Sequence, residues 1–260
     1  SGHLALFQTF FGMENMEEKY MFFTVLLHFG TLISVCMVYW RDIVDMIREF
    51  FLGIAALAGR KDTGVAPPPA RRMVMLIIIA TVPLFVMVFL QDAVNQLFSN
   101  SIMVSCALLA TGFILFFSDR MARGHKTAKN ATVADALIVG CGQALAVIPG
   151  LSRSGTTISV GMMRGFDRAF AVRFSFLMSL PAVLGANVLE IKDALASNFP
   201  IEELPMYLVG VAVSAVVGYF AIRLVKSLSD KGKFGKFAYY CWAVGLGSLV
   251  AGIVKMMLLK

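Results

Sequence analysis

"PGLSRSGTTI", residues 149–158, decides how the rest of the chain must fold, because it sets an arginine among serines and glycines in an otherwise apolar sequence. The 260 residues are 58% hydrophobic and only 15% charged, and their mean hydropathy is +0.79. An ordinary soluble domain carries about 25% charged residues. The composition therefore indicates a membrane protein, and Arg153 needs an explanation at membrane depth.

Six stretches are long and apolar enough to cross a membrane as helices, since a helical span needs roughly 20 apolar residues. Their continuous hydrophobicity excludes a porin-like barrel, whose strands alternate. The expected fold class is therefore all-α and polytopic. The predicted spans are residues 21–40, 73–91, 101–118, 169–190, 204–225 and 237–258.

Lysine and arginine alternate in number between the connections, which orients the chain by the positive-inside rule. Topology explains these cations, so no nucleic-acid partner is expected. The run of prolines at 67–69 predicts that the first basic connection is an extended linker. Basic residues number six in residues 41–72, none in 92–100, four in 119–133, one in 191–203 and five from Arg223 to Lys236.

Residues 133–165 do not fit this scheme as a simple span. They begin apolar, break at Pro149-Gly150 and continue through Arg153 to Arg164. If they crossed the membrane, every later connection would change sides. A re-entrant hairpin that enters and leaves on the cytoplasmic side keeps the basic connections inside, and irregular backbone is tolerated at membrane depth where it lines a cavity.

The start of the chain resembles the second half of this hairpin. "SGHLALFQTFFGM" from Ser1 parallels "SGTTISVGMMRGF" from Ser154, and three predicted spans follow each copy. An odd number of crossings turns the second copy upside down relative to the first. The sequence thus predicts one domain, residues 1–260, built as an inverted repeat of about 1–125 and 131–260, with its site between the halves.

The chemistry of the loop points to a phosphate. The guanidinium of Arg153 matches phosphate oxygens bidentately and stays charged. Glycine allows backbone N–H groups to turn towards an anion, and a helix start adds a positive dipole end. The alternative is that Arg153 extends to lipid head groups. The predicted phosphate-binding residues are Ser152, Ser154, Gly155, Thr156 and Thr157.

Three further polar residues are candidates. His3 follows Ser1 and Gly2 in the opposing repeat, where it could exchange a proton near neutral pH. Gln143 could bond the loop or a ligand, and helix packing explains it equally well. His28 lies within an apolar span, so a helix-packing role is the better interpretation.

The segment "GCGQALAVIPGLSRSGTTIS" resembles the second signature of the undecaprenyl-diphosphate phosphatases, and "FSFLMSLPAVLGA" and "LLHFGTLISV" extend the likeness. The resemblance implies a multi-pass enzyme of the bacterial inner membrane, linked to bacitracin resistance. It would hydrolyse a C55 isoprenyl diphosphate to the monophosphate and so recycle the lipid carrier of peptidoglycan synthesis. It also implies six spans with two re-entrant segments. Arg153 would grip the diphosphate, Ser1 and Gly2 would help to bind its phosphate, and His3 would assist proton transfer or hold the phosphoryl group.

The resemblance also implies a divalent cation, Mg²⁺ or Ca²⁺. The family's first signature is a Glu-x-x-x-Glu pair, then Pro-x-Ser-Ser, ending in Ser/Thr-Gly-His. Only the ending, Ser1-Gly2-His3, is present, so the metal-binding carboxylates are expected upstream of Ser1.

Two functions remain open: the phosphatase, and a transporter or flippase of a phosphorylated lipid or anion, since inverted repeats with broken helices are typical of transporters. Release of inorganic phosphate distinguishes them. The expected partners are the lipid substrate and membrane lipids, with a homodimer as a further expectation.

Overall fold

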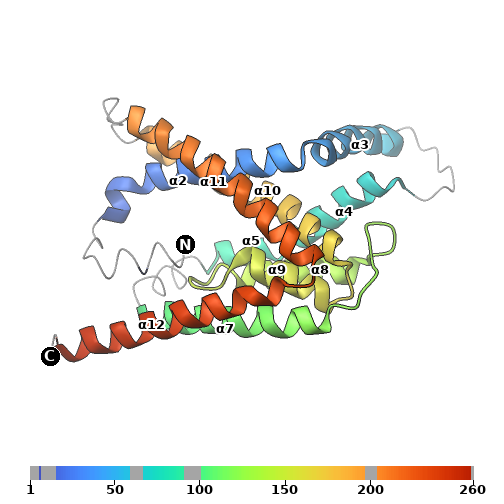
Figure 1. Ribbon diagram of the computed structural model, residues 1–260. Coiled ribbons are helices and arrows are strands. Elements are labelled where there is room, and N and C mark those ends of the chain that lie inside the picture. The colour runs from blue at the N-terminus through green and yellow to red at the C-terminus, as the bar shows by residue number, and fades with distance from the viewer. Residues whose placement is uncertain (1–5, 7–15, 59–66, 91–100, 197–203, 259–260) are drawn as a thin grey trace.

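The computed structural model describes residue 6 and residues 16–58, 67–90, 101–196 and 204–258, and within these ranges it contains helices and turns but no strand (Figure 1). The helices are α2 (Met16–Val38), α3 (Trp40–Ala58), α4 (Pro69–Thr81), α5 (Leu84–Val88), α7 (Ser101–Met121), α8 (Val133–Leu145), α9 (Arg153–Met163), α10 (Arg168–Ala196), α11 (Leu204–Asp230), the 3-10 helix η2 (Phe234–Lys236) and α12 (Phe237–Leu258).

The prediction of an all-α polytopic membrane protein is confirmed. Five stretches of the described chain are long and apolar enough to cross a membrane, and they correspond to five of the six predicted spans. The sixth predicted span, residues 21–40, coincides with α2, whose described apolar part, Leu26–Val38, is shorter. The five stretches are Pro69–Met87, Ile102–Met121, Arg168–Gly185, Leu204–Asp230 and Phe234–Met257.

The predicted extended linker over residues 41–72 is wrong in its first half, which forms helix α3. The charges of this segment exclude a membrane span, but a surface helix needs only one apolar stripe, and here apolar and charged residues alternate at helical spacing. Extended backbone occurs at Pro68, with φ −51° and ψ 148°, and Pro69 begins α4. The apolar stripe of α3 includes Ile43, Met46, Ile47, Phe50 and Ile54.

The two ends of the hairpin at residues 133–165 lie next to each other. Asp135, in the first turn of α8, is fully buried and lies 2.9 Å from the Arg164 guanidinium after α9 and 2.8 Å from Lys126 Nζ. Burial alone would raise the pKa of the Asp135 carboxyl, but hydrogen bonds from Lys126, Thr132 and Arg164 outweigh it and hold the pKa below its ordinary value. This clamp gives the re-entrant geometry that the charge pattern predicted.

Two long helix pairs enclose the hairpin: α2 packs along α11, and α7 packs along α12, with α8, α9 and α10 between them (Figure 1). Small residues let the first pair approach closely, since a Cβ on Gly30 would lie 2.6 Å from the Val211 carbonyl oxygen. Ser34 Oγ donates to the Ala215 carbonyl across this pair at 2.7 Å. The two pairs therefore form rigid walls around the hairpin.

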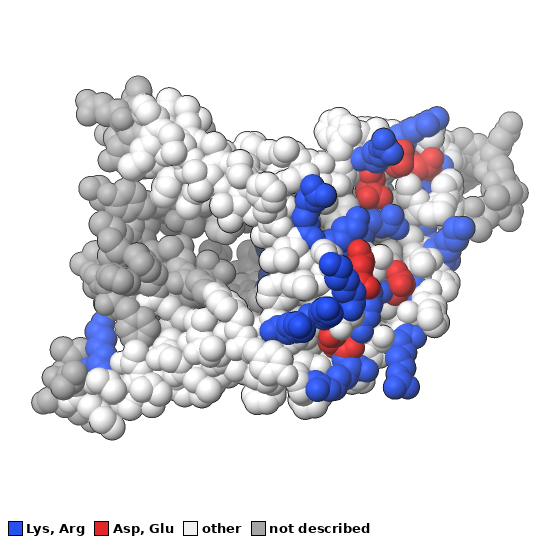
Figure 2. Space-filling model, in the orientation of Figure 1, with Lys and Arg blue, Asp and Glu red and all other residues white. Residues whose placement is uncertain are grey.

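Charged side chains gather at one end of the molecule, over the connections predicted to be cytoplasmic (Figure 2). Ion pairs there tie neighbouring helices together, so the basic connections form one layer. Arg71–Glu49 joins α4 to α3, Arg168–Asp119 joins α10 to α7, and Arg173–Asp42 joins α10 to α3.

The inverted repeat, with halves of about 1–125 and 131–260, stays a prediction. The first copy of the repeated segment would begin at Ser1, and residues 1–5 and 7–15 lie outside the described part of the chain.

Candidate functional site

The tip of the hairpin is a tight turn pressed against α7. Gly150 has φ +95°, and a Cβ there would lie 2.3 Å from the Val104 carbonyl oxygen, so only glycine fits without strain. Thr111 of α7 fixes both sides of the turn, because its hydroxyl donates to the Gly150 carbonyl at 3.1 Å and accepts from the Ser152 N–H at 3.2 Å. The turn therefore delivers the next residues in one orientation.

Ser152 starts helix α9. It is the N-cap, and its hydroxyl accepts from the Gly155 N–H at 3.1 Å. Gly155 is needed for this contact, since a Cβ there would lie 2.9 Å from Ser152 Oγ. The cap leaves the N-terminus of an 11-residue helix, with its positive dipole end, beside the side chain of Arg153.

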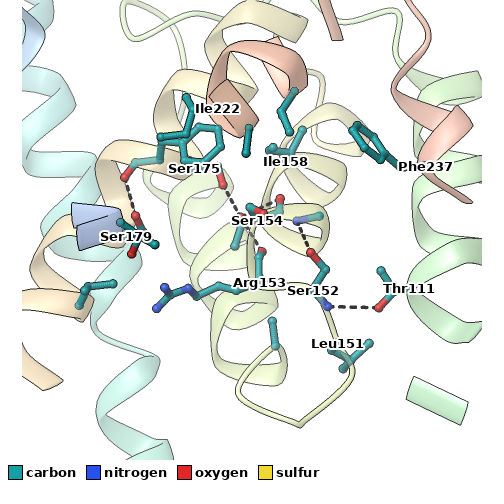
Figure 3. Close-up of a pocket in the computed structure, with 18 of the residues that line it drawn as sticks. Thr111, Leu151, Ser152, Arg153, Ser154, Ile158, Ser175, Ser179, Ile222 and Phe237 are labelled. Atoms are coloured by element: carbon teal, nitrogen blue, oxygen red, sulfur yellow. Dashed lines mark hydrogen bonds between the residues drawn. The ribbon is translucent and has the colours of Figure 1, made fainter. Parts of the chain in front are cut away.

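Arg153 is the first residue of α9 and lines a cavity of ≈ 670 Å³. Its guanidinium reaches away from the hairpin, and none of the described residues forms an ion pair or a hydrogen bond with it (Figure 3). The unmatched guanidinium and the helix N-terminus both favour an anion in this cavity.

The cavity is lined by both polar and apolar side chains. Hydroxyl, amide and imidazole side chains line it together with Arg153, and they belong to His28, Thr31, Thr111, Ser152, Ser154, Thr157, Ser175, Ser179, Asn187 and Tyr240. Apolar lining residues come from most of the surrounding helices, and the part that α11, η2 and α12 contribute, here called the apolar wall, includes Ile222, Val225, Phe234 and Phe237. Such a cavity suits a ligand with an anionic head and an apolar body.

The predicted site residues separate into three groups. Ser152, Arg153, Ser154, Gly155 and Thr157 line the cavity together. The Thr157 hydroxyl is nevertheless engaged internally, with the Arg153 carbonyl and with Ser175 Oγ.

Two predicted residues, Thr156 and Gln143, lie off the cavity lining. Thr156 faces α8, where its methyl group lies 3.7 Å from the Cβ position of Gly142, and Gln143 is completely buried in α8. In an α-helix each side chain is rotated by about 100° about the helix axis from the one before it. Consecutive hydroxyl residues of the motif therefore cannot all face one ligand. The third group, Ser1, Gly2 and His3, lies outside the described residues.

The sequence interpretation did not assign several polar cavity residues to the site, namely Thr31, Thr111, Tyr240, His28, Ser175, Ser179 and Asn187. The last three occupy one face of α10 at intervals of four and eight residues, and polar side chains in register within an apolar helix are the signal that could have identified them. His28 was interpreted as a packing residue because its span gives no sign of facing a cavity. Asn187 is 3% exposed and its Nδ2 has no hydrogen-bond partner in the described structure.

The described lining contains no aspartate or glutamate. Among the described residues no group of three His, Cys, Asp or Glu side chains is arranged to hold a metal ion. The described part of the cavity therefore does not by itself fit a magnesium site, which takes carboxylate and other oxygen ligands.

Similarity to known proteins extends over nearly the whole chain. Residues 1–247 match the family described as "Bacitracin resistance protein BacA". The chain is 40% identical over 246 residues to an undecaprenyl-diphosphatase of Alkaliphilus metalliredigens, which covers 94% of this chain and 88% of the relative. It is 38% identical over 255 residues to that of Halothermothrix orenii and 36% over 258 residues to that of Methanosphaera stadtmanae, each covering 91% of the relative. The chain therefore belongs to the BacA bacitracin resistance protein family.

Proposed function

We propose that the Arg153 cavity is the site at which this membrane phosphatase hydrolyses undecaprenyl diphosphate to undecaprenyl phosphate and inorganic phosphate. The family and the names of its relatives support the reaction. The observation that supports the location is the guanidinium of Arg153, which has no ion-pair or hydrogen-bond partner among the described residues and lies at the N-terminus of α9, inside a cavity that also has a long apolar wall.

In this proposal the diphosphate lies against the start of α9. The Arg153 guanidinium binds two phosphate oxygens, the first-turn N–H groups of the helix face the same anion, and the Ser154 hydroxyl borders it. As the terminal P–O bond breaks, charge builds up on the transferred group and on the departing lipid phosphate. Fixed positive groups stabilise that charge without rearranging.

The apolar wall accounts for the lipid. Ile222 and Val225 of α11 and Phe237 of α12 border the same cavity as Arg153. Burial of isoprenyl groups there is favourable by about 25 cal/mol per Å² of apolar surface. One cavity can therefore bind both the diphosphate head, at Arg153, and the first isoprene units, at the apolar wall.

Hydrolysis also needs a proton acceptor for the attacking group. The role of His3 in this step stays a prediction. Among the described residues, His28 is the histidine that lines the cavity. Phosphate release should therefore be measured for His28→Gln as well as for His3→Gln.

A divalent cation, Mg²⁺ or Ca²⁺, belongs to the proposal as well. When bound, it would neutralise phosphate oxygens. The described lining offers it no carboxylate, so its ligands would have to come from residues outside that lining. Activity of the natural full-length protein, measured after chelation and after readdition of each ion, tests the requirement.

We also propose that the protein resides in the bacterial inner membrane and acts there in peptidoglycan carrier recycling. Five membrane-length helices and a charged layer at one end support this placement.

The deciding experiment measures inorganic phosphate released from undecaprenyl diphosphate by Arg153→Lys. Lysine keeps the charge but loses the bidentate fork, and loss of an arginine that neutralises a transferring phosphoryl group costs on the order of 10³-fold. Arg123→Lys, at an exposed cation in the loop after α7, is the matched control and should retain activity. Phosphate release by Arg153→Lys at the control's rate would contradict the proposed site, and carriage of the lipid without phosphate release by the unaltered protein would favour a flippase.

A further inference from the structure

A second cavity, of ≈ 500 Å³, lies between the end of α2 and the end of α11. It shares no lining residue with the Arg153 cavity. We call it the interfacial groove. Its lining residues are Met37, Val38, Tyr219, Arg223, Lys226, Ser227, Asp230 and Lys231.

The groove carries excess positive charge. Three cations, Arg223, Lys226 and Lys231, face one carboxylate, Asp230, which leaves a net charge of +2. Other cations of the charged end, such as Arg71, are ion-paired. In the described structure none of the three groove cations has an Asp or Glu oxygen within 4.0 Å.

Arg223 is held in place although it is not neutralised. Its Nη1 donates to the Tyr219 hydroxyl at 3.1 Å, and its guanidinium carbon lies 5.5 Å from the centre of the Tyr219 ring. A tyrosine leaves the positive charge of arginine intact while restricting its motion. The groove thus offers an ordered cation to an anion from outside the protein.

The side chains around the groove indicate that it lies at the level of the membrane surface. Phe220 and Leu224, on the same helix as Arg223, are 63% and 53% exposed, as expected of side chains that face lipid. The three basic positions follow at the end of this apolar span. Trp40, two residues beyond Val38, is 63% exposed, and exposed tryptophan is typical of the boundary between hydrocarbon and water.

We propose that the interfacial groove binds the phosphate of an anionic membrane lipid from the cytoplasmic leaflet. Arg223 and Lys226 contact the phosphate, and the acyl chains lie against Met37 and the apolar face of α11. Basic pockets between membrane helices on the cytoplasmic side recognise acidic lipid head groups in this way. Lipid at this site would join α2 to α11, which form one wall of the Arg153 cavity.

The test uses tryptophan quenching by brominated lipids. Residues 1–260 contain two tryptophans, so Trp242→Phe leaves Trp40 as the reporter beside the groove. This 260-residue chain is reconstituted in phosphatidylcholine vesicles that contain a minor fraction of brominated phosphatidylglycerol or brominated phosphatidylcholine. The quenching curves give the relative affinity of the site for the two head groups.

We expect a preference for phosphatidylglycerol of roughly tenfold in the Trp242→Phe protein, because each basic side chain at an anionic surface strengthens binding several-fold. Arg223→Gln with Lys226→Gln should bring the ratio close to one. Arg123→Gln with Lys129→Gln removes the same charge from the loop after α7 and should keep the preference. Lys226→Gln alone, at an exposed side chain, gives an intermediate ratio if the double variant fails to fold.

Three results would overturn the proposal. One is equal quenching by the two brominated lipids in the Trp242→Phe protein. Another is an equal loss of preference in the groove variant and in the Arg123/Lys129 control, which would indicate a general surface charge. The third is displacement of the brominated lipid by inorganic phosphate, which would assign the groove to a soluble anion.

Discussion

Replacement of Gly150 by alanine should inactivate the protein by moving Arg153. A Cβ at this position would lie 2.3 Å from the Val104 carbonyl oxygen and 2.8 Å from Ala107 Cβ, whereas ordinary contacts begin at 3.4 Å. The turn must therefore move by about 1 Å, and a displacement of that size at a catalytic group costs on the order of 10²-fold in rate.

The same substitution should lower stability. An alanine at φ +95° carries a left-handed strain of roughly 1–2 kcal/mol, and overpacking against α7 adds about 1–3 kcal/mol. The sum, about 2–5 kcal/mol, corresponds to a decrease in Tm of roughly 5–15 °C. Thermal unfolding in detergent measures it, and phosphate release below the transition measures the activity of the folded fraction.

Gly247→Ala is the matched control. Apart from its own helix backbone and chain neighbours, no described residue has an atom within 4 Å of the Cβ position of Gly247 in α12, and its φ is not positive. This variant should keep both activity and Tm. If Gly150→Ala behaved like Gly247→Ala in both assays, the conformation of the turn would not be what positions Arg153, and the account of the hairpin tip would be refuted.

Three other perturbations have defined outcomes. Asp135→Asn removes the buried carboxylate from two cations whose side chains are 35% and 40% exposed and should cost about 2 kcal/mol, whereas Glu49→Gln, whose carboxylate is 18% exposed, should cost at most about 1 kcal/mol; parallel melting curves compare them, and equal shifts would contradict the clamp. Asn187→Ala should lower kcat/KM about tenfold with an unchanged Tm, because its amide nitrogen has no partner in the described structure to lose; a lowered Tm with normal activity would instead make it a packing residue. In a cysteine-free background, a cysteine at Lys233 should react only from the cytoplasmic side and one at Ser99 only from the opposite side, and labelling of both from one side would contradict the predicted topology.

Much of the fold follows from the sequence because the membrane restricts the choices. Hydrophobic length predicts the span at residues 237–258, which the structure shows as helix α12, and the charge alternation predicts the hairpin at 133–165 before any contact is known. Helix α3 was missed because the count of charges that excludes a span does not show whether apolar residues share a face. The interruption at Pro83, between α4 and α5, lies within a predicted span whose hydropathy is unbroken.

The site was only partly predictable for a different reason. The motif identifies Arg153 and the N-cap Ser152, since chain-local chemistry determines both. Which other side chains meet them depends on how distant helices rotate about their axes. Ser179 and Asn187 therefore became visible as cavity residues only when α10 was packed against the hairpin.

The clamp at the base of the hairpin sets the depth at which the reaction occurs. Helix α9 has 11 residues and is about 16 Å long at 1.5 Å per residue. The hydrocarbon core is about 30 Å thick, so Arg153 stands near the middle of the bilayer when the Asp135 end lies at its surface. Under the proposed function, a diphosphate head group leaves its leaflet surface and reaches about half the depth of the membrane to be hydrolysed, and the freed phosphate ion returns to water from the same depth. We therefore expect turnover to depend on how well water enters the Arg153 cavity.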